Sequence, residues 1–321
     1  MQFSLRSLKY VVTVAELGSV TEASRRLRIS QSAISTAVAE LETAFGTEIF
    51  VRHHARGVSL TTVGRRFVDE ARLVLKHAED FERSMSALGS QIAGEITVGC
   101  FGTLATRYMP ALLSEFARRM PAVTVRLEEG NQQEIVEGLL SGRMEIAIAY
   151  EYAVPPEIAG ETLVELPPYL LVSAEHRLAR RQKISLKDVA KEPFILLDLP
   201  HSREYFMGLF SACGIIPIIA YRSKSYELIR GLVGHGRGYT IHNALPGTSV
   251  TYDGSRVAAR PIVEPLPAVR VTSLRLRRQT IRPAVKAFAD FLPEAFSAGG
   301  LFQREKMPRG GASLTVGSQA N

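Results

Sequence analysis

The chain has 321 residues, of which 46% are hydrophobic and 22% charged, which predicts two or three domains with hydrophobic cores. The net charge of +7 favours a polyanionic partner. Cys100 and Cys213 lie far apart in the chain and exclude a disulfide framework, so a reducing cytoplasm is expected. No segment reads as a membrane span and the first residues do not read as a signal peptide, so we expect no membrane partner.

Two short helices are predicted before residue 28. The first covers about residues 5–17, where apolar residues recur at helical spacing, and it ends near Gly18. Ser19 and Glu22 have the spacing of a capping box and begin the second helix, which runs to Leu27. A tight turn over residues 28–30 leads into a third helix. Short helices joined in this way form a helix-turn-helix motif, in which the helix after the turn lies in the major groove of DNA.

The helix over residues 30–45 has an apolar face and a polar face. Its apolar residues recur at spacings of four, three and four and predict a buried stripe: Ile34, Val38, Leu41 and Phe45. Ser30 is a suitable N-cap. The polar face carries short uncharged side chains: Gln31, Ser32, Ser35 and Thr36. Small donors and acceptors at a helix N-terminus suit phosphate oxygens and base edges, although an ordinary surface helix has the same pattern.

A hairpin is predicted after this helix. Residues 49–51 and 58–60 have the pattern of short strands, and the loop between them carries Arg52, Arg56 and the pair His53–His54. Cations at a hairpin tip are typical of a wing that reaches a phosphate or enters the minor groove. The histidine pair has no further ligand nearby in the sequence, so we interpret it as wing surface and not as a metal site.

The runs ASRRL, ISQSAIS and AVAELE, followed by EIFVR and RGVSLTTVG, resemble the DNA-binding domain of LysR-type transcriptional regulators. The resemblance covers the whole predicted winged helix-turn-helix domain, residues 1–62. It implies groove contacts by Gln31, Ser32, Ser35 and Thr36, and backbone contacts by Ser30, Arg52 and Arg56. Many members carry basic residues after the serine at position 35, where this chain has Thr36, Ala37 and Ala39. The base-reading face is therefore less cationic, and we expect Arg52 and Arg56 to carry more of the phosphate contact.

Residues 63–93 are predicted to form one long helix that begins after Thr61 or Thr62. Its apolar residues alternate at spacings of four and three over three heptads: Phe67, Ala71, Val74, Ala78, Phe81, Met85 and Leu88. Such a seam packs either on a partner chain or on the domains of its own chain. A long helix between two domains would expose the seam, so we favour dimerisation. The resemblance implies the same role for this linker helix, and implies a homodimer or homotetramer.

Residues 94–296 alternate between predicted strands and helices, which indicates two parallel α/β units. We place a first lobe at residues 94–165 and 268–296, and a second lobe at residues 166–267. The chain would cross between the lobes twice, in the proline-rich stretches 151–168 and 261–268. The fold class is thus multi-domain, with α and α/β parts. The resemblance implies that the two lobes form an effector-binding domain like a periplasmic binding protein.

A ligand is expected in the cleft between the lobes, at loops that follow strand ends. These loops contain the candidate effector-binding residues Cys100, Phe101, Thr103, Asn131, Ser202, Arg203 and His242. Arg203 beside a helix N-terminus favours a small anion or carboxylate as the effector.

Other chemistry is poorly supported by the sequence. The glycines of Gly234-x-Gly236-x-Gly238 precede a predicted strand, which argues against a dinucleotide-binding loop. A redox role for Cys100 is a weaker interpretation than a small apolar residue. We find no catalytic residues, no metal site and no cofactor, and residues 297–321 are expected to be disordered.

These patterns together predict a cytoplasmic DNA-binding transcriptional regulator that responds to a small-molecule effector. A constitutive DNA-binding regulator without an effector is an alternative within the same class. An enzyme built on the α/β lobes, or a small-molecule binding protein of transport type, are alternatives from other classes. The lack of a nucleophile–base pair disfavours the enzyme, and the basic N-terminal domain disfavours the transport protein.

Overall fold

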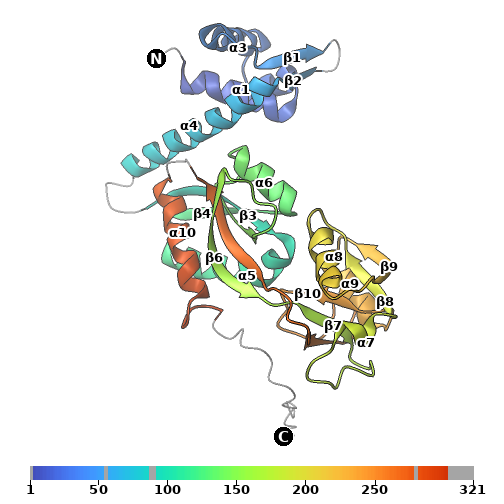
Figure 1. Ribbon diagram of the computed structural model, residues 1–321. Helices are drawn as coiled ribbons and strands as arrows, with labels where there is room; N and C mark the ends of the chain where they lie inside the picture. Colours follow the sequence, from blue (N-terminus) through green and yellow to red (C-terminus); the bar gives the residue numbers. More distant parts are fainter. Residues whose placement is uncertain (1–2, 54–56, 87–91, 278–280, 303–321) are drawn as a thin grey trace, which may run out of the picture.

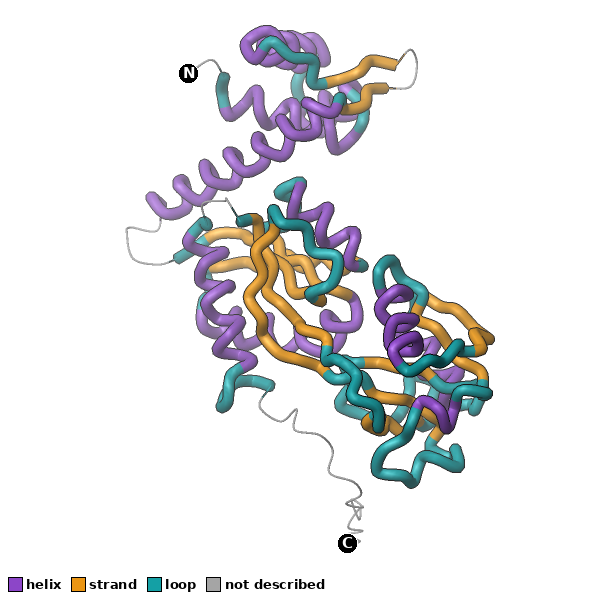
Figure 2. The backbone as a smooth tube through the Cα atoms, viewed as in Figure 1, coloured by secondary structure: helices purple, strands orange, loops and turns teal. Residues whose placement is uncertain are grey.

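The computed structural model describes residues 3–53, 57–86, 92–277 and 281–302. A small helical domain with a hairpin stands at one end, and a long helix connects it to two α/β lobes (Figure 1). The two lobes lie side by side and are joined by two adjacent crossings of the chain (Figure 2). His54, Arg56, Leu88 and the tail from residue 303, which all carried predictions, lie outside the described residues, as does the side chain of Met85.

The N-terminal domain contains α1 (Leu5–Leu17), α2 (Val20–Leu27), α3 (Gln31–Phe45), β1 (Phe50–His53) and β2 (Gly57–Leu60). Ile34, Val38 and Leu41 of α3 are buried as predicted. Phe45 is 46% exposed and meets Phe67 edge-on at 5.3 Å, so it lies at the rim of the core and not within it. Ser19 caps α2, but the carboxylate of Glu22 pairs with Arg25 and does not complete the predicted capping box.

Two glycines allow the hairpin to pack closely against the end of α1. The amide of Val58 donates to the carbonyl of Gly18 over 2.9 Å. A Cβ atom on Gly57 would lie 2.3 Å from that carbonyl oxygen, and Gly57 has a φ of +80°, so only glycine fits at the base of β2. This close contact fixes the direction in which the wing leaves the domain.

The linker helix α4 (Thr62–Ser86) begins at Thr61, whose hydroxyl accepts a hydrogen bond from the amide of Gly64 over 2.7 Å. Its first turns belong to the N-terminal domain, because Val68 and Ala71 are buried in that core. Farther along, Val74 is 39% exposed and Phe81 is 66% exposed. The predicted seam is therefore shared: Ala71 packs on the protein's own domain, while Val74 and Phe81 face outward.

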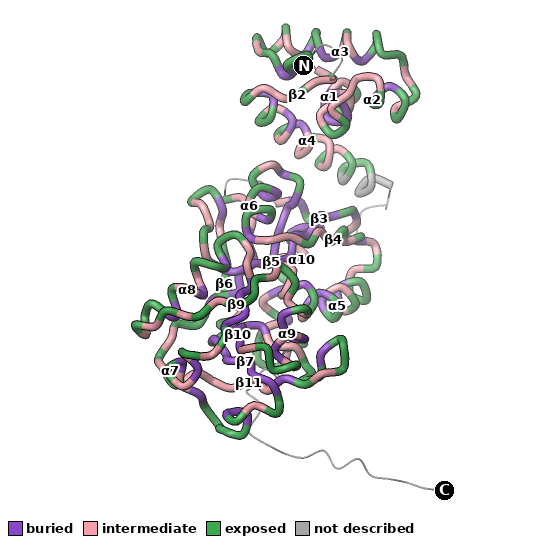
Figure 3. The backbone as a smooth tube through the Cα atoms, turned by 90° about the vertical axis from the view of Figure 1, so that its right-hand side faces the viewer, coloured by how far each residue is buried: buried purple, intermediate pink, exposed green. Residues whose placement is uncertain are grey.

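The first lobe is built on one five-stranded sheet of order β4-β3-β5-β12-β6. Its strands are β3 (Gly94–Phe101), β4 (Val123–Gly130), β5 (Ile146–Tyr150), β6 (Ile158–Leu166) and β12 (Val269–Leu276). Its helices are α5 (Gly102–Arg119), α6 (Gln132–Leu140) and α10 (Pro283–Phe296). Every residue of β5 is buried, as expected for a strand covered by helices on both faces, and Figure 3 shows this buried centre.

The second lobe contains β7 (Tyr169–Ser173), α7 (Leu186–Val189), β8 (Pro193–Leu197), α8 (Ser202–Ala212), β9 (Ile218–Ser223), α9 (Tyr226–Gly234), β10 (Thr240–His242) and β11 (Val257–Pro261). Strands β10, β7 and β11 form one sheet, and β8 pairs with β9. An isolated bridge between Phe194 and Tyr239 connects the two groups. Ser185 and Asp188 form a capping box at the start of α7.

The prediction of parallel α/β units is confirmed for β3 with β4 and β5 and for β8 with β9, but the remaining strand pairs are antiparallel. β12 runs antiparallel to both β5 and β6, and β7 runs antiparallel to both β10 and β11. The strands β6 and β11 were not predicted. Both lie at the edge of a sheet and lack a continuous apolar run, so their hydrophobic pattern does not indicate a strand. The first crossing is correspondingly shorter than predicted and consists of Pro167 and Pro168 between β6 and β7.

A buried ionic cluster attaches α4 to the first lobe. Nε of Arg282 donates to Oε1 of Glu145 over 2.7 Å, and Nη2 donates to Oε2 over 2.8 Å. Both side chains are nearly fully buried. Lys76 of α4 adds its ammonium group at 3.3 Å from Glu145 and donates to the carbonyl of Gly142. The linker helix is thereby tied to the loop between α6 and β5.

Replacing Arg282 with alanine would leave Glu145 as a buried carboxylate whose remaining cation is Lys76. We expect Arg282→Ala to lower the free energy of unfolding by about 3–5 kcal/mol, the range measured when one partner of a buried pair is removed. Lys286→Ala is the matched control, because Lys286 lies on the same helix in an exposed pair with Asp290. Urea unfolding followed by circular dichroism measures both, and equal effects of the two substitutions would contradict the role of the cluster.

Candidate functional site

The first candidate surface is the N-terminal face of α3. The hydroxyl of Ser30 accepts from the amide of Ala33 over 3.2 Å and lies 3.0 Å from the hydroxyl of Ser32. Gln31, Ser32 and Thr36 are exposed, and Ser35 is half-buried. The first turn of α3 carries no acidic side chain. The polar residues predicted for groove contact therefore lie together at the positive end of a helix dipole, where an anion is stabilised.

The wing provides the cationic side chain of the predicted DNA-binding surface. Arg52 on β1 is exposed and makes no ion pair with any residue in the described ranges. Nε2 of His53 lies 2.7 Å from the hydroxyl of Ser59 on the paired strand, so this side chain links the two strands of the hairpin. Among described residues, no group of three or more His, Cys, Asp and Glu side chains could hold a metal ion.

The second candidate site is a small cavity between the two lobes. Four of the predicted effector residues line it: Phe101, Thr103, Ser202 and His242. They come from the end of β3, the starts of α5 and α8, and the end of β10. The cavity has a volume of about 20 Å³, which is room for one water molecule. The cleft is therefore closed in this conformation.

Tyrosines that the sequence reading missed close the cleft. The rings of Tyr150 and Tyr152 stack at 5.6 Å, and that of Tyr205 continues the stack at 6.0 Å from Tyr152. Tyr150 and Tyr152 belong to the first lobe and Tyr205 to the second, so the stack crosses the lobe boundary.

The hydroxyl groups of two of these tyrosines contact hydroxyl groups of predicted effector-binding residues. The hydroxyl of Thr103 lies 3.0 Å from that of Tyr150 within the first lobe. The hydroxyl of Ser202 lies 3.1 Å from that of Tyr152, across the lobe boundary. An available signal was the position of Tyr150 and Tyr152 at the carboxyl end of a buried strand, where ligands of α/β folds bind.

His242 is an almost fully buried polar group of the cleft. Its ring meets Tyr226 edge-on at 4.2 Å, and its Nε2 atom has no hydrogen-bond partner within the described part of the chain. Burial, with a smaller contribution from Arg230, lowers the pKa of His242 to about 3. The ring is therefore neutral at physiological pH. Nε2 can donate or accept a hydrogen bond with a ligand, depending on the tautomer, but the ring cannot supply a positive charge.

Three predicted effector residues lie elsewhere. Cys100 is wholly buried in the core of the first lobe, and burial raises the pKa of its thiol. The stretch expected as a loop is instead the end of β3 followed directly by α5, so Cys100 points into the core. Asn131 caps α6 by accepting from the amides of Gln133 and Glu134. Arg203 is half-exposed, and its Nε donates to Asp198 over 2.7 Å.

The cleft thus offers hydroxyl groups, aromatic faces and one neutral imidazole, and its lining contains no lysine or arginine. Two helices begin there without a side-chain cap, α5 after Phe101 and α8 after His201. At α8 the amides of Ser202 and Arg203 already donate to the carbonyl of Leu199, so it is the first turn of α5 that offers amides as donors. This arrangement can bind and orient a small polar molecule, and it contains no nucleophile with an adjacent base.

A winged helix-turn-helix, a long linker helix and a closed two-lobed cleft together define a ligand-responsive DNA-binding regulator. The family model described as LysR substrate binding domain matches residues 89–297, and that of the bacterial regulatory helix-turn-helix protein, lysR family, matches residues 5–65. The chain belongs to the LysR family of transcriptional regulators, which are not enzymes. None of the described helices is both long and apolar enough to cross a bilayer.

Relatives cover nearly the whole chain. An uncharacterised HTH-type transcriptional regulator, YnfL of Escherichia coli, is 30% identical over 75% of this chain and 82% of its own. The crystal structure of HinK, a LysR family regulator from Pseudomonas aeruginosa, is 40% identical with a TM-score of 0.62, and covers 92% of this chain and 99% of that one. CbnR in complex with its target DNA is 26% identical with a TM-score of 0.62, over 90% and 99% of the two chains.

The depressed pKa of His242 predicts an acid-sensitive fold. The imidazole takes up a proton below about pH 6.5 in the unfolded chain but only near pH 3 in the folded one. Stability is therefore lost as the pH falls from 6.5 toward 3. Between pH 7 and pH 5.5, the free energy of unfolding of His242→Gln, measured with urea, should fall by about 1 kcal/mol less than that of the unmodified protein. His77→Gln, at an exposed position on α4, should follow the unmodified protein; a parallel loss in all three would rule out His242.

Proposed function

We propose that α3 enters the major groove of DNA through Gln31, Ser32, Ser35 and Thr36, while Ser30 and the wing contact the backbone. The observation that carries this proposal is the exposed, uncharged N-terminal face of α3 beside the cation Arg52, which has no ion-pair partner among described residues. Uncharged side chains read base edges by hydrogen bonds, whereas Arg52 supplies sequence-independent attraction to phosphate. CbnR, a relative of the same architecture, has been crystallised with its target DNA.

Two substitutions separate base reading from phosphate contact. Gln31→Ala should weaken binding to the operator by about 1–3 kcal/mol and leave nonspecific binding unchanged. Arg52→Ala should weaken both and lower the slope of log affinity against log salt by about 1. Fluorescence anisotropy on DNA from upstream of the protein's own gene, with nonspecific competitor, measures both effects. Lys224→Ala, at an exposed position on the second lobe, is the matched control, and an Arg52→Ala protein that behaves like it would refute the wing assignment.

Dimerisation through α4 is part of the same proposal. Val74 and Phe81 expose apolar surface on the outward side of the helix, after the turns that belong to the protein's own core. Burying this strip against a second copy would remove it from water and place two α3 helices for two half-sites. A cytoplasmic location follows from the need to reach the chromosome.

For the effector we propose a small hydroxylated molecule bound in the cleft by Phe101, Thr103, Ser202 and His242, together with Tyr150, Tyr152 and Tyr205. Arg203 does not support the carboxylate predicted from the sequence, because its guanidinium group is paired with Asp198 and does not line the cavity. An anionic group on the ligand would meet the first-turn amides of α5, because the amides of Ser202 and Arg203 at α8 are already bonded to Leu199. Because the cavity holds about one water molecule, binding requires the lobes to separate. The ligand then favours the open arrangement by the difference in its affinity for the two states.

The contact between Tyr152 and Ser202 should help to hold the cleft closed. Tyr152→Phe removes this interlobe hydrogen bond, which contributes about 0.5–1.5 kcal/mol. We expect hydrogen exchange of the first-turn amides of α8 to become about 2–10 times faster in that variant. Tyr221→Phe, at an exposed position on β9, is the matched control. Unchanged exchange in Tyr152→Phe would show that the lobes are not held by this contact.

A further inference from the structure

A second and much larger cavity lies at the hinge between the lobes. Its volume is about 670 Å³, within the range of small-molecule sites. One wall is formed by the end of β6 and the crossing into β7, including Leu166 and Pro167. Strand β11 and the loop of residues 245–249 form another wall, and Arg107 and Tyr108 of α5 close the first-lobe side. We call it the hinge pocket.

A short strip of chain separates the hinge pocket from the cleft. His242 and Ala244 line the cleft, Leu245 lines the hinge pocket, and Asn243 lines both. The amide of Asn243 donates to the carbonyl of Leu166 over 3.0 Å and to the hydroxyl of Tyr205 over 2.8 Å. The hinge pocket is therefore a distinct space behind the cleft and not an extension of it.

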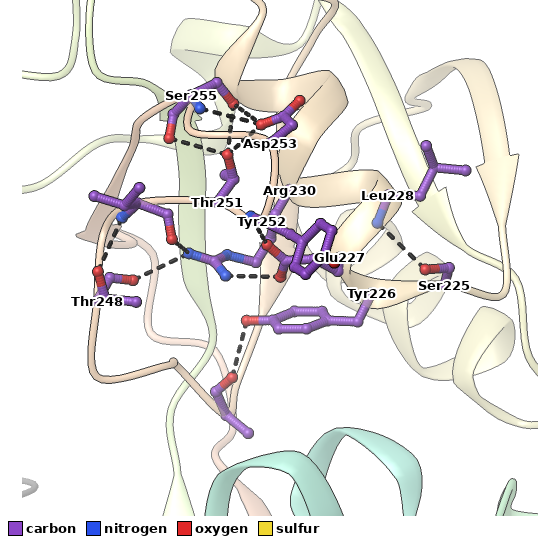
Figure 4. A network of polar contacts seen from close by, with 12 residues as sticks. Ser225, Tyr226, Glu227, Leu228, Arg230, Thr248, Thr251, Tyr252, Asp253 and Ser255 are labelled. Carbon is purple, nitrogen blue, oxygen red and sulfur yellow. Dashed lines mark hydrogen bonds and ion pairs between the residues drawn. The ribbon is translucent and has the colours of Figure 1, made fainter.

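The wall of the hinge pocket is held in place by Arg230. This side chain is buried, with Nη1 donating to Glu227 over 2.7 Å and Nη2 donating to the carbonyls of Thr248 and Val250 over 3.0 Å each. Figure 4 shows the guanidinium group between the Glu227 carboxylate and the loop that carries Thr248. Nε of Arg107 donates to the carbonyl of Leu245 at the start of the same loop. The pocket is thus preformed by fixed backbone.

The charge of the lining is positive. Three arginines line the pocket, Arg107, Arg230 and Arg260, against one acid, Glu165. Glu165 is already paired with Arg270, and Glu227 compensates Arg230. Arg260 donates only to the carbonyl of Ala259 and has no ion-pair partner among the residues described. The remaining lining includes Val164, Leu171, Val257 and Tyr169, so the guanidinium group of Arg260 borders a largely apolar space.

We propose that the hinge pocket is a second ligand site, and that it binds an amphipathic carboxylate whose anionic group pairs with Arg260 and whose apolar part lies against β6, β7 and β11. A carboxylate forms short charge-assisted hydrogen bonds with a guanidinium group, and the apolar walls supply the burial energy. The cleft, with its neutral hydroxylated lining, selects a different class of molecule.

Isothermal titration calorimetry of the full chain with phenylacetate, and with phenylacetamide as the uncharged analogue, tests the proposal. Phenylacetate should bind at least about tenfold more tightly than phenylacetamide. Arg260→Gln should remove this preference and weaken phenylacetate binding by at least about tenfold. Arg256→Gln is the matched control, because Arg256 is exposed, lies just before β11 and does not line the pocket.

Ala258→Phe provides a second variant that places a ring into the cavity and should abolish binding, while its melting temperature reports whether the fold is retained. Absence of phenylacetate binding at millimolar concentration, equal affinity for both compounds, or an Arg260→Gln protein with unchanged affinity would each overturn the proposal. DNA binding is measured separately on Arg260→Gln, so failure of the hinge site is distinguishable from failure of the regulatory function.

Discussion

The attachment of the linker helix to the first lobe depends on the buried ion pair between Arg282 and Glu145, which Lys76 of the linker helix joins. An isolated buried carboxylate would be costly, and here both of its oxygens accept from one guanidinium group. Since α4 also contributes Val68 and Ala71 to the core of the DNA-binding domain, the same helix is anchored to both domains. The first lobe and the winged helix-turn-helix are therefore positioned by one rigid element, and the second lobe is left as the part that can move.

Motion of the second lobe has few covalent constraints. Only two crossings connect the lobes, Pro167–Pro168 and the stretch between β11 and β12, and both are adjacent at the hinge. The noncovalent constraints include the tyrosine stack and the hydrogen bond between Tyr152 and Ser202 on the cleft side, and the bonds of Arg107 to Leu245 and of Asn243 to Leu166 at the hinge. These contacts are individually modest, so a ligand that prefers the separated arrangement needs only a few kcal/mol of differential affinity to change the populations.

Periodicity predicted most elements of this fold but not the roles of individual polar residues. The stripe of Ile34, Val38 and Leu41 follows directly from helical spacing, because burial of one face is a local property. Arg203 was assigned to a ligand because the sequence does not reveal that Asp198, five residues earlier, lies within hydrogen-bond distance. Tyr150, Tyr152 and Tyr205 were missed because their contact exists only when two lobes, distant in sequence, close on each other.

The positions of the charges argue for two cavities with separate chemistry. Burial, and to a smaller extent the charge of Arg230, lower the pKa of His242, yet the hydrogen bonds of Arg230 go to Glu227 and the loop of the hinge pocket. The cleft is thus kept neutral while positive charge is held behind it. Asn243 touches both spaces and is bonded to the end of β6 and to Tyr205, so a rotation of the lobes must alter both cavities. If the hinge pocket binds a ligand as proposed, occupancy of one cavity would change the affinity of the other, and this coupling would be reciprocal because both respond to the same two arrangements.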